Sequence, residues 1–135
     1  MKSKWHGQPC PICGEGTLAD SVRKTEERYK GVPFVTLVRG AFCDNCHDGF
    51  PEFNPEQEAA WLAFRDRVDA EEAAELSRIR KKLRLAQAKA AVLAGGGKNA
   101  FSRYEKGKAK PVAAVINLFR LLDRHPELLE ELQPE

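Results

Sequence analysis

Gly95-Gly96-Gly97-Lys98-Asn99-Ala100-Phe101-Ser102-Arg103-Tyr104-Glu105-Lys106-Gly107 is the stretch that decides the fold. Apolar residues recur at helical spacing before and after the three glycines, so the sequence predicts two short helices joined by a glycine turn. Gly107 readily adopts the left-handed conformation that ends a helix, and Pro111 keeps the following segment from continuing it.

A helix over residues 98–106 would have two different faces, because its residues advance by about 100° each. Ala100, Phe101 and Tyr104 fall on the packing face. The opposite arc suits a DNA major groove, since Asn pairs bidentately with adenine, Arg with guanine, and Lys neutralises phosphates. We expect Asn99 and Arg103 to read base edges, and Lys98, Ser102 and Lys106 to contact the DNA backbone. The alternative for Arg103 is a surface ion pair with Glu105 or a neighbouring helix.

The triple glycine does not match a phosphate-binding loop. That pattern requires another Gly five residues before Gly97 and a Ser or Thr after Lys98. The chain has Val92 and Asn99 at these places, which excludes nucleotide binding there.

Charge is distributed unevenly along the 135 residues, although the formal net charge is only +2. Residues 1–69 hold 9 Lys or Arg against 11 Asp or Glu, whereas residues 70–135 hold 13 against 9. Between residues 78 and 110, 11 basic residues face a single acid, Glu105. The positive electrostatic field of so many basic residues attracts polyanions such as nucleic acids. A lysine-rich face that only contacts solvent would have the same composition.

All four cysteines lie in the acidic half, as two Cys-x-x-Cys pairs separated by 29 residues. Each pair sits in a turn-prone segment, and two such turns can aim four thiolates at one point. Four protein ligands leave no open position for a substrate water, so the pattern predicts one structural zinc ion per chain. The expected ligands are Cys10, Cys13, Cys43 and Cys46.

Other uses of these cysteines are disfavoured. Disulfides suit a secreted chain, but Met1 leads into no signal-peptide apolar stretch. A thioredoxin-like redox pair lacks its βαβ surroundings. His6 and His47 lie close enough in sequence to replace a ligand, yet four thiolates already complete the set, so we expect both on the surface.

The remaining pattern predicts a small β unit and then helices. Residues 16–22 and 34–42 resemble short strands, and the polar residues 26–33 resemble a turn-prone connection. Asn54 and Pro55 are a typical helix start. An apolar stripe follows at helical spacing, and we expect it to pack against the β unit; it consists of Trp61, Phe64 and Val68.

A second helical stretch over residues 70–85 places the domain boundary near residue 69. The predicted fold is α+β in two domains. Residues 1–69 form a zinc-stapled β unit with a helix, and residues 70–135 form an all-α helix-turn-helix domain of about five helices. The sequence leaves open whether the join is flexible or helical.

The C-terminal half carries more apolar residues than one small helical core requires, which indicates a homodimer. Most of them are expected inside the domain and a minority at a partner interface. The residues are Val112, Val115, Ile116, Phe119, Leu121, Leu122, Leu128, Leu129 and Leu132.

Composition narrows the function classes. With 42% hydrophobic and 31% charged residues the chain should fold, and no apolar run is long enough for a bilayer span, so we expect a cytoplasmic protein without membrane contact. No catalytic Ser-His-Asp or Cys-His constellation is evident, so we expect no enzymatic activity.

The chain resembles the MqsA-type antitoxins over nearly its whole length. The resemblance rests on the paired cysteine motifs, Arg80-Lys81-Lys82-Leu83, residues 95–107, and His125-Pro126-Glu127-Leu128-Leu129. It implies a zinc lobe that captures a cognate ribonuclease toxin, and a helix-turn-helix dimer that represses the shared operon by binding an inverted repeat in double-stranded operator DNA. Its base-reading residues fall on Asn99 and Arg103, and its zinc ligands on the four cysteines.

Two features depart from this pattern. Ala86 stands where such domains usually carry a Ser or Thr that caps the second helix, and the stretch before Cys10 is long and has no assigned role. Two other functions remain open: a zinc-ribbon enzyme subunit or RNA-processing factor that uses its basic half on RNA, and a stand-alone zinc-containing helix-turn-helix regulator without a toxin partner.

Overall fold

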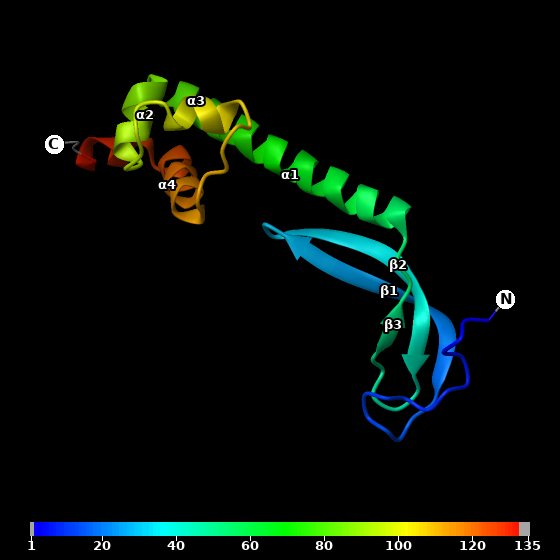
Figure 1. The fold of residues 1–135 in the computed structure, drawn as a ribbon. Helices are drawn as coiled ribbons and strands as arrows, with labels where there is room; N and C mark the ends of the chain where they lie inside the picture. The colour runs from blue at the N-terminus through cyan, green and yellow to red at the C-terminus, as the bar shows by residue number, and fades with distance from the viewer. Residues whose placement is uncertain (1, 133–135) are drawn as a thin grey trace. The chain divides into compact units, whose positions relative to one another are not determined.

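The computed structural model describes residues 2–132 and divides the chain into two compact units, Met1–Arg65 and Asp66–Glu135. The division falls inside helix α1 (Pro55–Lys82), shortly before the expected boundary at residue 69. Figure 1 shows β1, β2 and β3 preceding this helix, and α2, α3 and α4 following it along the chain. The join is therefore helical, an alternative that the sequence left open.

The first unit is built on a three-stranded antiparallel sheet in the order β1-β2-β3. Strands β1 (Leu18–Tyr29) and β2 (Val32–Cys43) form a long hairpin, and β3 (Gly49–Pro51) pairs with the end of β2 beside the cysteines. Both strands are longer than the sequence indicated, because residues 26–33 are not a loop. Glu26 pairs with Val35, and Tyr29 pairs with Val32.

A two-residue turn closes this hairpin. Lys30 and Gly31 both have positive φ angles, 51° and 81°, as a turn that matches the twist of a hairpin requires. Much of the ribbon is exposed, so its strands tolerate the polar residues that the sequence analysis assigned to a connection.

Helix α1 begins at Pro55, as predicted, and Asn54 caps it. The Asn54 Oδ1 atom accepts hydrogen bonds from the backbone N–H groups of Glu56 and Gln57 at 3.0 and 3.3 Å. Trp61 and Phe64 pack on the ribbon through Phe34, with ring centroids 5.4 and 4.8 Å away. These two members of the predicted stripe therefore pack as expected, whereas Val68 belongs to the second unit.

The second unit contains the C-terminal part of α1 and four further helices. They are α2 (Gln87–Leu93), α3 (Ala100–Glu105), α4 (Ala113–Arg124) and the 3₁₀-helix η1 (Pro126–Glu131). Their core is centred on Leu76, Ile79, Phe101 and Phe119, all almost completely buried. With α2 and α3 joined by the glycine turn, this is the predicted helix-turn-helix unit.

Helices α1, α2 and α3 end in the same way. A residue with positive φ follows each helix, namely Arg84, Gly95 and Gly107. After α3, the N–H of Gly107 bonds to Tyr104 O and the N–H of Lys108 bonds to Arg103 O, which is the Schellman arrangement. Gly107 is thus the left-handed stop that the sequence predicted.

Helix α3 is shorter than the predicted helix over residues 98–106. Lys98 and Asn99 lie in a turn before it, because the N–H of Ala100 bonds to Gly97 O. Asn99 is the N-cap residue, with a non-helical ψ of 0°. Lys98 therefore does not share the helical periodicity used to place it on the polar arc.

Much of the C-terminal apolar set is used inside the second unit. Val115, Ile116, Phe119 and Leu122 are buried there, and Leu128, Leu129 and Leu132 are half-buried. Val112 and Leu121 stay exposed.

Candidate metal centre and nucleic-acid interface

The four cysteines meet at one end of the hairpin in the first unit. All four Sγ atoms lie within 4.8 Å of one another. Cys10 and Cys46 approach to 3.8 Å between sulfurs, and Cys13 and Cys43 to 3.7 Å. The hairpin causes this meeting, because Leu18, just after the first pair, is opposite Cys43 in the register.

Local backbone turns aim the sulfurs. Within the first pair, the Ile12 N–H donates to Cys10 Sγ, and Gly14 adopts a φ of 75° to close the turn. Within the second pair, the N–H groups of Asn45 and Cys46 donate to Cys43 Sγ at 3.3 and 3.4 Å. Such hydrogen bonds stabilise thiolates and fix their direction.

The sulfurs differ in their tendency to ionise. Hydrogen bonds from the backbone of Glu15, then from the Asn45 side chain and the backbone of Gly16, lower the pKa of Cys13 to about 6. For Cys46, a backbone hydrogen bond at Asp48 lowers the pKa, but desolvation and the three neighbouring cysteine sulfurs outweigh it and raise the pKa to about 12. A bound cation would relieve this crowding, since metal binding displaces the thiol protons.

This donor set fits a tetrahedral metal ion. With metal–sulfur bonds of about 2.3 Å, the edges of a sulfur tetrahedron are about 3.8 Å long, which agrees with the two closest sulfur pairs. All four cysteines are free rather than joined in disulfides. Cys10, Cys13, Cys43 and Cys46 can therefore bind one metal ion, and four protein ligands make it a structural one.

Neither neighbouring histidine joins the cluster among residues 2–132. His47 is exposed, as expected. His6 is half-buried rather than on the surface, and its Nδ1 atom accepts a hydrogen bond from the Asp20 N–H at 3.0 Å.

Sequence reasoning missed two contributions to this centre. Gly16 is buried so tightly that a Cβ atom there would overlap Cys43 Sγ. The sequence pattern predicted only that a strand starts at this residue. The segment before Cys10, which had no assigned role, is part of the unit. Trp5 stacks on Phe50 with centroids 4.3 Å apart, and Ser3 donates two hydrogen bonds to Asp20.

The polar residues around α3 in the second unit are available to a ligand. Lys98, Asn99, Arg103 and Lys106 are exposed, and Ser102 is half-buried. The Asn99 side chain makes no cap hydrogen bond.

Glu105, the acid nearest Arg103, pairs instead with Arg80 of α1. Arg80 Nε and Nη2 donate to the two carboxylate oxygens at 2.9 Å, and both side chains are mostly buried. Burial raises the pKa of Glu105, but hydrogen bonds from Arg80 and Ser77 outweigh it and keep the pKa below its ordinary value. Within residues 2–132, Arg103 has no ion-pair partner.

Acids from distant parts of the chain neutralise part of the basic stretch. Asp123 pairs with Arg78 and Lys82, and Asp69 pairs with Lys110. Seven of the 11 basic residues between positions 78 and 110 have no ion-pair partner in the described part of the chain. They are Lys81, Arg84, Lys89, Lys98, Arg103, Lys106 and Lys108.

A unit whose four cysteines can hold a metal ion, and a helical unit with an exposed basic helix-turn-helix, together place the chain in the helix-turn-helix class. Residues 8–133 match the family model described as the antitoxin component of a bacterial toxin-antitoxin system, MqsA. The chain is also 39% identical over 131 residues to Antitoxin MqsA of Escherichia coli strain K12, covering 92% of this chain and 98% of that protein. The chain belongs to the MqsA family of antitoxins, which is not a family of enzymes.

As an antitoxin, the protein has a toxin as its partner. Among the helices of residues 2–132, none combines the length and the apolar character that a membrane crossing demands.

Proposed function

We propose that the protein neutralises an mRNA-cleaving ribonuclease toxin and represses its own operon by binding operator DNA. Its membership of an antitoxin family across both units carries this proposal. Both roles are binding roles without catalysis, and both are exercised in the cytoplasm.

Residues 1–69 bind the toxin and residues 70–135 bind DNA. The first part carries two more acidic than basic residues, which suits a basic ribonuclease, and the second carries four more basic than acidic residues, which suits DNA. Zinc at Cys10, Cys13, Cys43 and Cys46 stabilises the fold of the first unit and takes no part in chemistry.

Asn99 and Arg103 read base edges, supported by their exposure at the start and middle of the second helix of the helix-turn-helix. Lys98, Ser102 and Lys106 contact phosphates. Lys98 is suited to this from the turn before α3, because a phosphate contact requires only reach and charge.

The DNA-bound form is a homodimer on an inverted repeat, with contacts between copies of the second unit. Val112 and Leu121, which are 66% and 47% exposed, supply apolar surface for this pairing. Light scattering of the full chain should give twice the monomer mass at micromolar concentration, and a monomer there would contradict the pairing.

Titration of operator and scrambled duplexes at several salt concentrations tests DNA reading. Asn99→Ala or Arg103→Ala should cost about 1–3 kcal/mol of operator binding and reduce discrimination between the duplexes. Lys98→Ala or Lys106→Ala should weaken both duplexes equally and reduce the salt slope by about one unit. Arg103→Ala with full discrimination would show that Arg103 is not a base reader.

Co-purification with the product of the neighbouring reading frame tests the toxin role. A stable complex that suppresses RNA cleavage by that product is expected. Operator binding without any toxin complex would instead identify a stand-alone transcription regulator.

A further inference from the structure

A groove in the first unit lies between β2 and the start of α1. Its volume is about 330 Å³, and aromatic and acidic side chains dominate its lining. We call it the aromatic-acidic groove and define it by Phe34, Phe53, Trp61, Glu27, Glu52 and Glu58.

The aromatic wall combines two rings that pack within the unit with a third ring that the unit leaves exposed. Phe34 and Trp61 meet edge to face with centroids 5.4 Å apart, which fixes both rings. Phe53 stands at the rim and is 80% exposed. An exposed phenylalanine beside a hollow is typical of a protein-binding surface, where large aromatic side chains contribute most of the affinity.

The charge of the groove is entirely negative. Glu27, Glu52 and Glu58 line it, and no Lys or Arg does. Within residues 2–132 none of these three carboxylates has an ion-pair partner.

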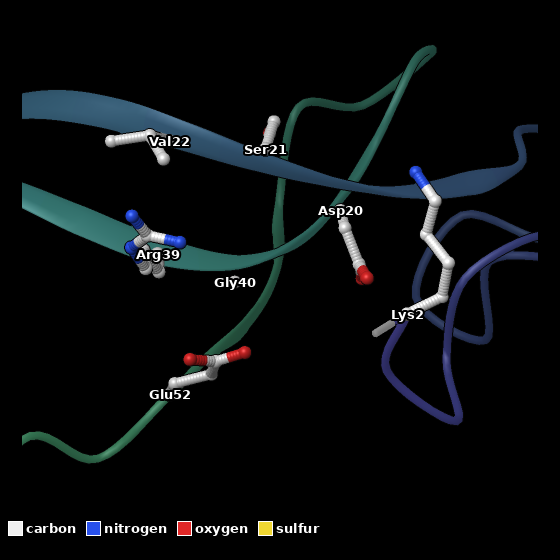
Figure 2. Close-up of a pocket in the computed structure, with 7 residues that line it drawn as sticks. All are labelled: Lys2, Asp20, Ser21, Val22, Arg39, Gly40 and Glu52. Atoms are coloured by element: carbon white, nitrogen blue, oxygen red, sulfur yellow. The ribbon is translucent and has the colours of Figure 1, made fainter.

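A neighbouring hollow of about 320 Å³ shows the contrast (Figure 2). It is lined by Lys2 and Asp20 on one side and by Arg39 and Glu52 on the other, so positive and negative groups balance. Glu52 lines both hollows and shares this one with Arg39, so the excess negative charge of the aromatic-acidic groove comes from Glu27 and Glu58.

We propose that the aromatic-acidic groove receives a lysine or arginine side chain of the toxin, presented on a segment whose apolar residues cover Phe53. The proposal rests on the proposed function, in which the first unit binds the toxin. A cation within about 6 Å of an aromatic ring is attracted by the ring face. The same cation can form charge-assisted hydrogen bonds with the carboxylates. A protein segment fits better than a small ligand, because only a partner with its own apolar surface can bury the exposed Phe53 ring.

The test measures the dissociation constant of the full-length chain with the toxin encoded beside it. Phe53→Ala and Glu58→Lys alter the groove, while Glu56→Lys makes the same charge change in the same helical turn outside the groove lining. We expect the two groove variants to weaken binding by about tenfold or more, and the control by less than about threefold. Metal content and circular dichroism verify that each variant is folded.

A charge exchange identifies the contact. Each basic surface residue of the toxin is changed to Glu and combined with Glu58→Lys, and one such exchange should restore binding. If no exchange restores binding, the groove does not hold a toxin cation and the proposal is wrong.

Three other results of the binding measurement would each overturn the proposal for the groove. Wild-type toxin affinity for both groove variants overturns the proposal while leaving the toxin role intact. A change in oligomeric state with unchanged toxin affinity assigns the groove to a second copy of the chain and overturns it too. Failure of the wild-type chain to bind the toxin refutes the proposed function, and the groove assignment with it.

Discussion

Replacing Arg80 by Leu should destabilise the second unit more than any comparable change at a surface arginine. The Arg80 guanidinium joins three elements: Nε and Nη2 bond to Glu105 of α3, and Nη1 bonds to Leu85 O before α2, all at 2.9 Å. The Arg80 and Glu105 side chains are only 13% and 10% exposed. Without Arg80, a carboxylate stays buried with no cation.

The burial of this ion pair determines how much unfolding free energy Arg80→Leu should remove. Breaking a fully buried ion pair by removing one partner costs about 3–5 kcal/mol. Ser77 and Gln87 still hydrogen-bond to Glu105, and some solvent reaches it, so we expect about 2–3 kcal/mol for Arg80→Leu. In a unit of this size, that corresponds to a decrease in the melting temperature of about 8–24 °C.

Thermal unfolding followed by far-ultraviolet circular dichroism measures this loss, because most helical residues lie in the second unit. Tryptophan fluorescence is an internal control, since Trp5 and Trp61, the only two tryptophans, both lie in the first unit. Arg78→Leu is the matched variant, because Arg78 is 57% exposed in its pair with Asp123, so solvent screens that pair and its loss should cost much less than the loss of the buried pair. Equal destabilisation by Arg80→Leu and Arg78→Leu would refute the reasoning.

Three further changes have defined outcomes. Ala86 is the N-cap of α2 with extended backbone and no side-chain cap bond, so Ala86→Ser should stabilise the second unit by about 0.5–2 kcal/mol in thermal unfolding. Gly16→Ala places a methyl group on Cys43 Sγ and should weaken metal binding by about 10- to 100-fold in a chelator competition. Hydrogen bonds from Arg78 and then Lys82 lower the pKa of Asp123 from 3.8 to about 2, so this carboxylate stabilises the folded state above its unfolded pKa of 3.8 and loses that effect as the pH falls towards 2. Asp123→Asn should therefore be less stable than wild type at neutral pH, and the difference should vanish in acid unfolding below about pH 2.

Each of these has a control or a contradicting result. Ala88→Ser, inside α2, should slightly destabilise the unit, and a gain there equal to that of Ala86→Ser would rule out capping as the cause. Thr17→Ala changes an exposed neighbour of Gly16 and should leave metal affinity unchanged. A stability difference between wild type and Asp123→Asn that stays constant from neutral pH down to pH 2 would contradict the role of the carboxylate charge.

Local patterns in the sequence correctly predicted the features that depend on residues close together in the chain. The Cys-x-x-Cys spacing predicted the four-sulfur cluster, and Asn54-Pro55 predicted the start of α1. Gly107 predicted the end of α3, because a left-handed helix stop has a clear residue preference.

Features that depend on distant residues could not be predicted in this way. The second strand pairs with residues 26–29 despite their polarity, because the partner strand and the Lys30-Gly31 turn determine their conformation. The partner of Glu105 is Arg80, 25 residues earlier, and only the packing of α3 on α1 reveals it. The steric role of Gly16 likewise depends on Cys43, which the hairpin brings beside it.

The boundary between the two units lies inside α1, and this determines how a protease could separate them. Between Arg65 and Asp66 the backbone belongs to a helix that continues to Lys82, so no extended loop is available for cleavage. A protease can cut this backbone only after the helix has unfolded locally. When local unfolding is fast and reversible, the cleavage rate reports its free energy. Once cut, both fragments would have a helix end without its capping partners, so each should unfold more readily than the same unit in the intact chain.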